Sequence, residues 1–153
     1  MNTKNIKIFA ALSVILLLFT YYVGTPYMTI AALNYVFILA GFLMRKKNRM
    51  LHVRFVSLGI LSDLCLVLIL QYQRDAIGTA ISFKLSFLNQ AHIFSSLIAT
   101  LLYIPMAITG AMILKKEKLK NWHQKFGYMV ITFRTLGLIL MYSMIDSLKD
   151  KLQ

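Results

Sequence analysis

The chain has 153 residues, of which 59% are hydrophobic, and its mean hydropathy is +0.70. These values leave too little polar surface to cover a water-soluble globule, so we expect an integral membrane protein with one domain over residues 1–153. The net charge of +12 comes from basic residues in short segments between apolar runs, which is typical of membrane topology and argues against a nucleic-acid partner.

Five apolar stretches are each close to the roughly 20 helical residues that cross a bilayer. Lipid offers no partners to backbone N–H and C=O groups, so these stretches should be helical, and the alternating polarity of a β-barrel is missing from the sequence. The sequence therefore predicts an all-α bundle of five transmembrane helices at residues 8–24, 27–44, 51–71, 85–114 and 126–144.

The first stretch is separated from the second by Gly24, Thr25 and Pro26. Proline prevents simple continuation of a helix, so we expect a tight turn and a helical hairpin here. Lys4 and Lys7 ahead of the apolar run also resemble a signal peptide, but no Ala-x-Ala cleavage site follows. We expect the segment to be retained, and its cleavage would leave four helices.

The distribution of Lys and Arg predicts the orientation, because basic residues near helix ends are retained in the cytoplasm. With a cytoplasmic amino terminus, twelve basic residues face inward and four face outward. The outward residues are Arg74, Lys84, Lys149 and Lys151, and the inward ones are Lys4, Lys7, Arg45, Lys46, Lys47, Arg49, Arg54, Lys115, Lys116, Lys118, Lys120 and Lys125.

The third and fifth stretches open on similar strings, Leu-His-Val-Arg-Phe at 51–55 and Trp-His-Gln-Lys-Phe at 122–126. Asp63 follows His52 by eleven residues, and Arg134 follows His123 by the same spacing. Eleven residues are about three helical turns and about 16 Å, so each histidine shares a helix face with a charge. Residues 27–71 and 85–144 are therefore candidates for a parallel hairpin repeat, although lysine-rich loops could also converge on such strings.

Asp63 and Arg134 should lie at similar depth near the middle of the membrane, where an unpaired charge is costly. One interpretation is a structural intramembrane ion pair between the third and fifth helices, and the other is a proton or ion relay or an anion site at Arg134. Small residues near these charges, Gly59, Ser62 and Gly127, should allow close approach of neighbouring helices.

The histidines are candidate cofactor ligands. His52 and His123 should lie at the inner membrane level, where imidazoles on facing helices could ligate haem b. A copper or other metal site near Met50 is a second interpretation, and an interfacial structural role is a third. His92 opens the fourth stretch from the other side of the membrane, on the order of 20 Å too far to complete the same site.

Residues that would support hydrolysis or phosphoryl transfer are missing from the sequence. It has no Gly-rich phosphate loop, nucleophile elbow, HExxH motif or paired carboxylates, and its one cysteine, Cys65, excludes a CxxC pair. We therefore expect no catalytic residue for hydrolysis or phosphoryl transfer, and these motifs leave other enzymatic activity open.

Several short strings over residues 45–144 resemble a family of small bacterial multi-pass membrane proteins of unknown function. Some members of that family support assembly of haem-copper oxidases. The strings are His52 with Arg54, Ala91-His92-Ile93, Tyr103-Ile104-Pro105, and His123 with Lys125. In the family the basic residue should follow the histidine directly, whereas Val53 and Gln124 intervene here. The histidines and Thr109-Gly110 also resemble transmembrane b-type cytochromes.

The resemblance implies a protein of the bacterial inner membrane with other membrane subunits as partners. The leading hypothesis is an accessory or assembly factor of a respiratory haem-copper oxidase, with His52, His92 and His123 contacting haem, metal or quinone. The alternatives are a b-type haem electron-transfer protein ligated by His52 and His123, and a purely structural subunit of a membrane complex.

Overall fold

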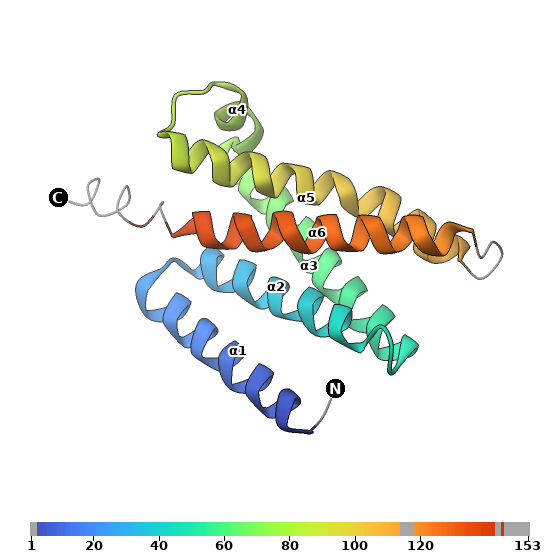
Figure 1. The fold of residues 1–153 in the computed structure, drawn as a ribbon. Coiled ribbons are helices and arrows are strands. Elements are labelled where there is room, and N and C mark those ends of the chain that lie inside the picture. The colour runs from blue at the N-terminus through green and yellow to red at the C-terminus, as the bar shows by residue number, and fades with distance from the viewer. Residues whose placement is uncertain (1–2, 114–117, 143–144, 146–153) are drawn as a thin grey trace. The chain divides into compact units, whose positions relative to one another are not determined.

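A computed structural model describes residues 3–113, 118–142 and 145 of the chain (Figure 1). Within those residues every regular element is a helix, which confirms the all-α prediction. The helices are α1 (Thr3–Val23), α2 (Pro26–Met44), α3 (Arg49–Arg74), α4 (Ala76–Ile81), α5 (Phe87–Met112) and α6 (Leu119–Met141).

Four of these helices are long and apolar enough to cross a membrane, and they match the first four predicted stretches. They cover Asn5–Val23, Pro26–Met44, Arg49–Gln73 and Phe87–Met112. The fifth predicted stretch overlaps α6, which is helical but is not among the four. The reason is its polarity, since α6 carries Lys120, Lys125 and Arg134. The predicted end of the fifth span at residue 144 lies outside the described residues, as does the end of the fourth at residue 114.

Large apolar side chains cover the outside of the long helices. Leu12 on α1 is 61% exposed, Leu68 on α3 is 68% exposed, and Phe87 at the start of α5 is 84% exposed. Apolar faces of this kind would aggregate in water, whereas lipid is a matching solvent for them. The exposed apolar side chains and the length of the helices together indicate a membrane protein.

Local hydrogen bonds explain where α2 and α3 begin. Thr25 caps α2 by accepting from the N–H of Met28 at 3.4 Å, and Pro26 occupies the first turn, where its missing N–H is harmless. Asn48 caps α3 in the same way, accepting from the N–H of Leu51 at 3.0 Å. The Gly-Thr-Pro turn predicted from the sequence is thus present.

The end of α3 depends on a left-handed residue, Asp75, whose φ is 44°. Its backbone N–H donates to the carbonyl of Gln71 at 3.1 Å, and the Gln71 side chain accepts from the N–H of Ile77 at 2.8 Å. These bonds turn the chain into α4, a short helix that the sequence did not predict.

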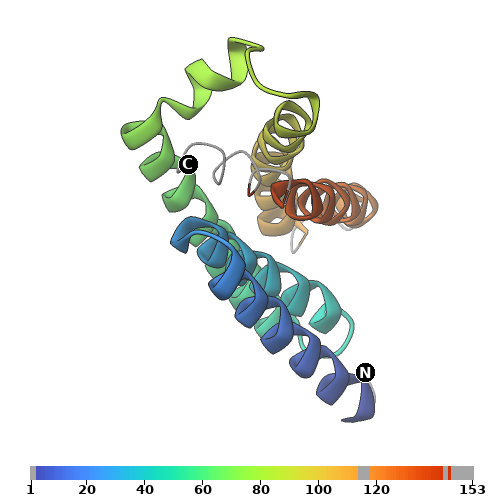
Figure 2. The same cartoon turned by 90° about the vertical axis from the view of Figure 1, so that its left-hand side faces the viewer.

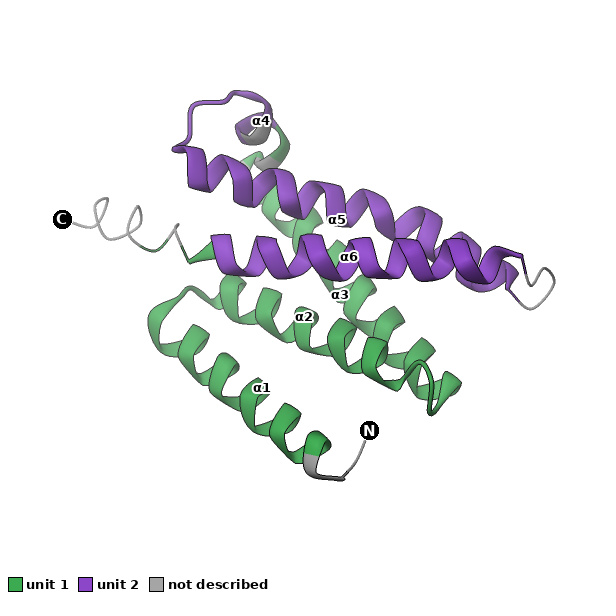
Figure 3. Cartoon of the chain, in the orientation of Figure 1, with its two compact units in different colours: residues 1–77, 141–153 green, residues 78–140 purple. Residues whose placement is uncertain are grey.

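The chain divides into two compact units (Figure 3). Unit 1 contains residues 1–77 and 141–153, and unit 2 contains residues 78–140. In unit 1, α2 packs against α1 and against α3 (Figure 2). The α2–α3 pair is an antiparallel hairpin, because Tyr27 donates to Gln73 at one end and His52 bonds to Gly41 at the other.

Unit 2 contains a second antiparallel hairpin, formed by α5 and α6. His92 bonds to Gly137 near one end of this pair, and His123 bonds to Met106 near the other. Residues at helical spacing along α5 are buried, including Ala99 at 0% and Tyr103 at 2% exposure. The helix continues through Pro105 without a break.

Candidate functional site

His52 lies in the first turn of α3 and bonds across the hairpin to α2. Its Nδ1 atom is 2.8 Å from the carbonyl oxygen of Gly41. In a continuing helix that carbonyl would accept from the N–H of Arg45, but this N–H instead donates to Phe42 at 3.4 Å as α2 ends. The imidazole therefore satisfies an acceptor that the helix end leaves available.

Glycine at position 41 is what allows the two helices to approach. A Cβ atom there would lie 2.6 Å from Cγ2 of Val56 and 2.9 Å from its backbone nitrogen. Gly59, on α3, is packed as closely, since a Cβ would lie 2.7 Å from Cγ1 of Ile38 and 3.1 Å from the carbonyl of Asn34. The close approach expected at Gly59 is thus present, and Gly41 adds a second contact that sequence reasoning missed.

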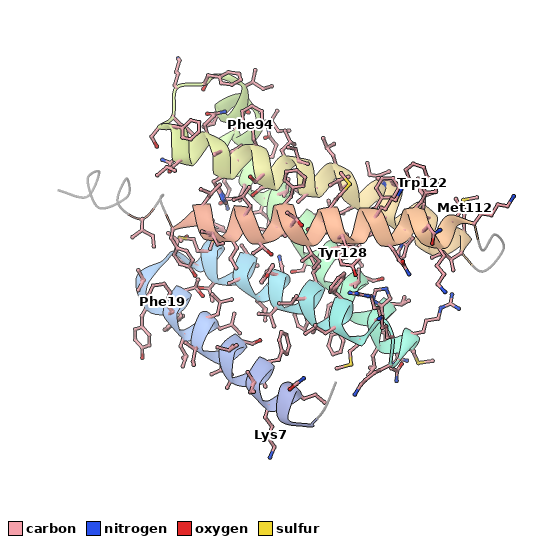
Figure 4. The ribbon with its side chains drawn as sticks, in the orientation of Figure 1. Lys7, Phe19, Phe94, Met112, Trp122 and Tyr128 are labelled. Atoms are coloured by element: carbon pink, nitrogen blue, oxygen red, sulfur yellow. The ribbon has the colours of Figure 1, made fainter. Side chains whose placement is uncertain are left out.

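His123 has a corresponding position in the second hairpin. Its Nδ1 atom lies 3.1 Å from the carbonyl oxygen of Met106 and 3.2 Å from Oγ1 of Thr109. The Thr109 hydroxyl donates to the carbonyl of Pro105 at 2.7 Å, so its oxygen can accept from the imidazole. Gly110 borders the ring, with a Cβ there 3.0 Å from Cε1 of His123. Met112 and Trp122 mark this end of the pair in Figure 4.

His92 repeats the pattern at the opposite end of the α5–α6 hairpin. Its Nδ1 atom is 2.7 Å from the carbonyl oxygen of Gly137, a glycine whose Cβ would lie 3.0 Å from Oγ of Ser96. Gly137 follows His123 by fourteen residues along α6, which is about 21 Å of helix rise. Within unit 2, His92 and His123 therefore belong to separate sites.

The three bonds assign the same tautomer to all three imidazoles. A carbonyl oxygen only accepts hydrogen bonds, so each Nδ1 atom must carry the proton, and in the neutral ring Nε2 then keeps its lone pair. An Nδ1–H group bound to a carbonyl is the arrangement that orients a metal- or haem-ligating histidine. The same Nε2 atom could accept a proton or a hydrogen bond from a hydroxyl group.

The two hairpins share this arrangement, which agrees with the hairpin repeat at 27–71 and 85–144 but leaves the duplication a prediction. In each, a histidine near the start of the second helix donates to a carbonyl in the last two turns of the first. The separations differ, since His52 and Gly41 are eleven residues apart and His123 and Met106 are seventeen apart.

Asp63 is buried in α3 at 2% exposure and belongs to a polar layer that includes Asn34 of α2, at 0% exposure. With the Asn34 amide turned so that its nitrogen meets acceptors, it donates to Oγ of Ser62 at 2.8 Å and accepts from the backbone N–H of Asp63 at 3.2 Å. Sequence reasoning missed Asn34, although it is the only amide side chain in the stretch at 27–44.

Arg134 is buried in α6 at 9% exposure, three residues before Gly137. It belongs to unit 2 and Asp63 to unit 1, so the ion pair between them stays a prediction. A Cβ at Gly127 would meet no atom within 4 Å, and its expected approach to the third helix, which belongs to the other unit, stays a prediction. Gly137 lies about 80° around the helix from Gly127, and it is Gly137 that contacts α5.

The histidines were also considered as ligands of a metal ion and of haem, and the structure bears on these two kinds of site in different ways. Among residues 3–113, 118–142 and 145, no three His, Cys, Asp or Glu side chains come together in a way that could hold a metal ion. A haem with one or two axial histidines is a different kind of site, and its pairing of His52 with His123 joins two units and stays a prediction. Comparison with protein-family models, with curated proteins and with solved structures found no match to this chain.

Proposed function

We propose that this chain is an accessory or assembly protein of a respiratory haem-copper oxidase. In this proposal it crosses the bacterial cytoplasmic membrane five times, with its amino terminus inside, and His52, His92 and His123 contact haem, a metal or quinone. The observation that supports it is the shared tautomer, in which a helix carbonyl orients each Nδ1–H and the neutral ring carries its lone pair on Nε2. The bias of basic residues supports the orientation.

A b-type haem electron-transfer protein is the second candidate, and the donor chemistry fits it. The neutral Nε2 atom is the ligand that haem iron takes from histidine, and basic side chains neutralise propionates. Arg54 follows His52 by two residues, Lys125 follows His123 by two, and both basic side chains are exposed. Haem, when bound, would supply one-electron transfer, while this chain would orient the ring and exclude water.

A reduced-minus-oxidised spectrum tests the haem candidate directly. The full chain is expressed with ample haem, purified in mild detergent and reduced with dithionite. Soret and α bands that disappear in the double variant His52→Ala and His123→Ala would support haem b. A featureless spectrum of the folded native chain would eliminate the electron-transfer candidate and leave the accessory role standing.

Co-purification tests the accessory role. Membranes of a bacterium that expresses the tagged chain are solubilised in mild detergent, and the captured material is assayed for haem-copper oxidase spectra and oxygen consumption. We expect oxidase to be captured with the native chain. Capture of no respiratory complex, together with normal oxidase activity in cells that lack the chain, would refute the proposal.

Matched substitutions separate a ligand role of the histidines from a structural one. The side-chain nitrogen of asparagine can take the place of Nδ1 and still donate to the carbonyl, but asparagine has no group at Nε2. If the histidines are ligands, His52→Asn should fold normally and fail in oxidase assembly as completely as His52→Ala. If His52 only holds the two helices together, His52→Asn should retain activity and His52→Ala should lose stability. A purely structural subunit, the third candidate, should keep assembly and activity when all three histidines are replaced by Ala.

A further inference from the structure

The turn between α2 and α3 carries an exposed cluster of positive charge, which we call the basic turn. It consists of Arg45, Lys46, Lys47, Arg49 and Arg54. All of them are exposed except Arg45, which is half-buried. Figure 4 shows nitrogen-tipped side chains gathered where this hairpin turns. The cluster joins two helices that are each long and apolar enough to cross a membrane.

The segment that carries the basic turn contains no acidic residue. Residues 26–62 contain neither Asp nor Glu, and the first turn of α3 carries no acidic side chain. Asp63, the next acidic residue along the chain, is buried at 2% exposure and follows Arg54 by nine residues, about 13 Å of helix rise. The segment therefore carries a net positive charge, and its exposed Lys46, Arg49 and Arg54 attract anions.

Arg45 is held at the end of α2 by contacts with Phe42. Its guanidinium carbon lies 3.7 Å from the centre of the Phe42 ring, and Nη1 donates to the Phe42 carbonyl at 3.4 Å. These contacts keep the charge at the level where the apolar part of α2 ends. A cation at that depth lies beside the phosphates of a bilayer.

Apolar side chains stand exposed among these charges. Met50 is 62% exposed, Val53 is 51% exposed and Leu51 is 36% exposed, all in the first two turns of α3. A soluble anion gains nothing from contact with apolar side chains, whereas a lipid presents a phosphate and an acyl chain side by side. The combination of cations and apolar side chains fits the boundary between headgroups and acyl chains.

We propose that the basic turn is a binding surface for anionic phospholipid, whose phosphodiester pairs with its Lys and Arg side chains while the acyl chains cover Met50 and Val53. This proposal does not depend on what the histidines bind, although Arg54 also follows His52 by two residues, and it holds whether or not the chain serves an oxidase. It selects phosphatidylglycerol or cardiolipin over zwitterionic lipid by charge.

Spin-labelled lipids measure this selectivity on the full chain in phosphatidylcholine bilayers. We expect labelled phosphatidylglycerol to be retained more strongly than labelled phosphatidylcholine, and the difference to shrink as salt is raised. The variant Lys46→Gln should weaken the preference by up to roughly fivefold, and the triple variant with Lys47→Gln and Arg49→Gln by more. Lys84→Gln, an exposed lysine in a loop of unit 2, is the matched control and should leave the preference unchanged.

Three results would overturn the proposal. Equal retention of the two labelled lipids by the native chain would remove the selectivity without reference to any variant. If Lys46→Gln and Lys84→Gln reduced the preference for phosphatidylglycerol equally, the preference would come from the net charge of the protein and not from the basic turn. Displacement of the lipid by inorganic phosphate, but not by chloride at the same ionic strength, would assign the turn to a soluble phosphate.

Discussion

The Nδ1 atom of His52 lies 2.8 Å from the carbonyl oxygen of Gly41, and this bond joins the end of α2 to the start of α3. The bond depends on close packing of the two helices, because glycine at position 41 brings Val56 against the backbone of α2. His52 and Gly41 therefore act together. His52 donates the hydrogen bond, and the absence of a side chain at Gly41 lets the two helices come close enough for the bond to form.

Alanine at position 41 should separate the two helices. Its Cβ atom would lie 2.6 Å from Cγ2 of Val56 and 2.9 Å from the Val56 backbone nitrogen, so α3 must shift. We expect Gly41→Ala to destabilise the protein by about 1–3 kcal/mol, as overpacking does. The measurement is the midpoint of thermal loss of helical circular dichroism in mild detergent.

Gly127→Ala is the matched control for that experiment. A Cβ atom at position 127 meets nothing within 4 Å, so the substitution should gain up to about 1 kcal/mol from helix propensity. Opposite signs for the two glycines are therefore expected. If both substitutions moved the midpoint in the same direction by the same amount, the close packing of Gly41 on Val56 would be wrong.

The buried amide of Asn34 should stabilise the α2–α3 pair through Ser62. The Asn34 nitrogen donates to Ser62 Oγ at 2.8 Å, and the Asn34 side chain has 0% exposure. A double-mutant cycle of Asn34→Ala and Ser62→Ala should give a coupling of about 0.6 kcal/mol, with an upper value near 1.7 kcal/mol, as for other hydrogen bonds between membrane helices. Stability is measured by the same thermal midpoint.

The exposed Ser57 on α3 supplies the control. Pairing Asn34→Ala with Ser57→Ala should give additive effects, since an exposed serine makes no comparable contact with α2. Additivity in the Ser62 cycle as well would mean that Asn34 stabilises the hairpin by packing alone.

The sequence predicted the helices better than the contacts between them, and there is a physical reason for the difference. Length and apolarity of a helix can be read directly from the sequence, so the first four predicted stretches lie within a few residues of the four helices that are long and apolar enough to cross a membrane. Contacts between helices depend on rotation about each axis, which one sequence does not determine. The partners of the histidines, Gly41, Gly137 and Met106, were therefore not foreseen.

The glycines illustrate the same limit. Gly137 was not singled out from the sequence, yet it is the glycine of α6 that lies against Ser96 of α5. The amide of Asn34 was a readable signal, because a single amide in an apolar stretch needs a partner inside the membrane. A search for isolated polar residues in apolar stretches would have found it.

The orientation of the α2–α3 and α4–α5 connections can be measured by cysteine labelling. In a Cys65→Ala background, Lys84→Cys should react with a membrane-impermeant thiol reagent added to intact cells, because the positive-inside rule predicts that this loop lies outside. Lys46→Cys should react only after the cells are opened. Both lysines are exposed, so a difference in labelling reports the side of the membrane.

The reverse labelling pattern would place the basic turn outside and would contradict the proposed cytoplasmic amino terminus. Labelling of both positions in intact cells would indicate that α3 does not cross the bilayer. Either result would leave the helical fold intact and would change only its placement in the membrane.

The same method counts the spans at α6. This helix is 23 residues long, which is enough to cross a bilayer, but Lys120, Lys125 and Arg134 lower its apolarity. If α6 crosses, Ser143→Cys should be labelled from outside intact cells while Lys118→Cys is not. If α6 lies along the inner surface instead, both positions should be protected until the cells are opened.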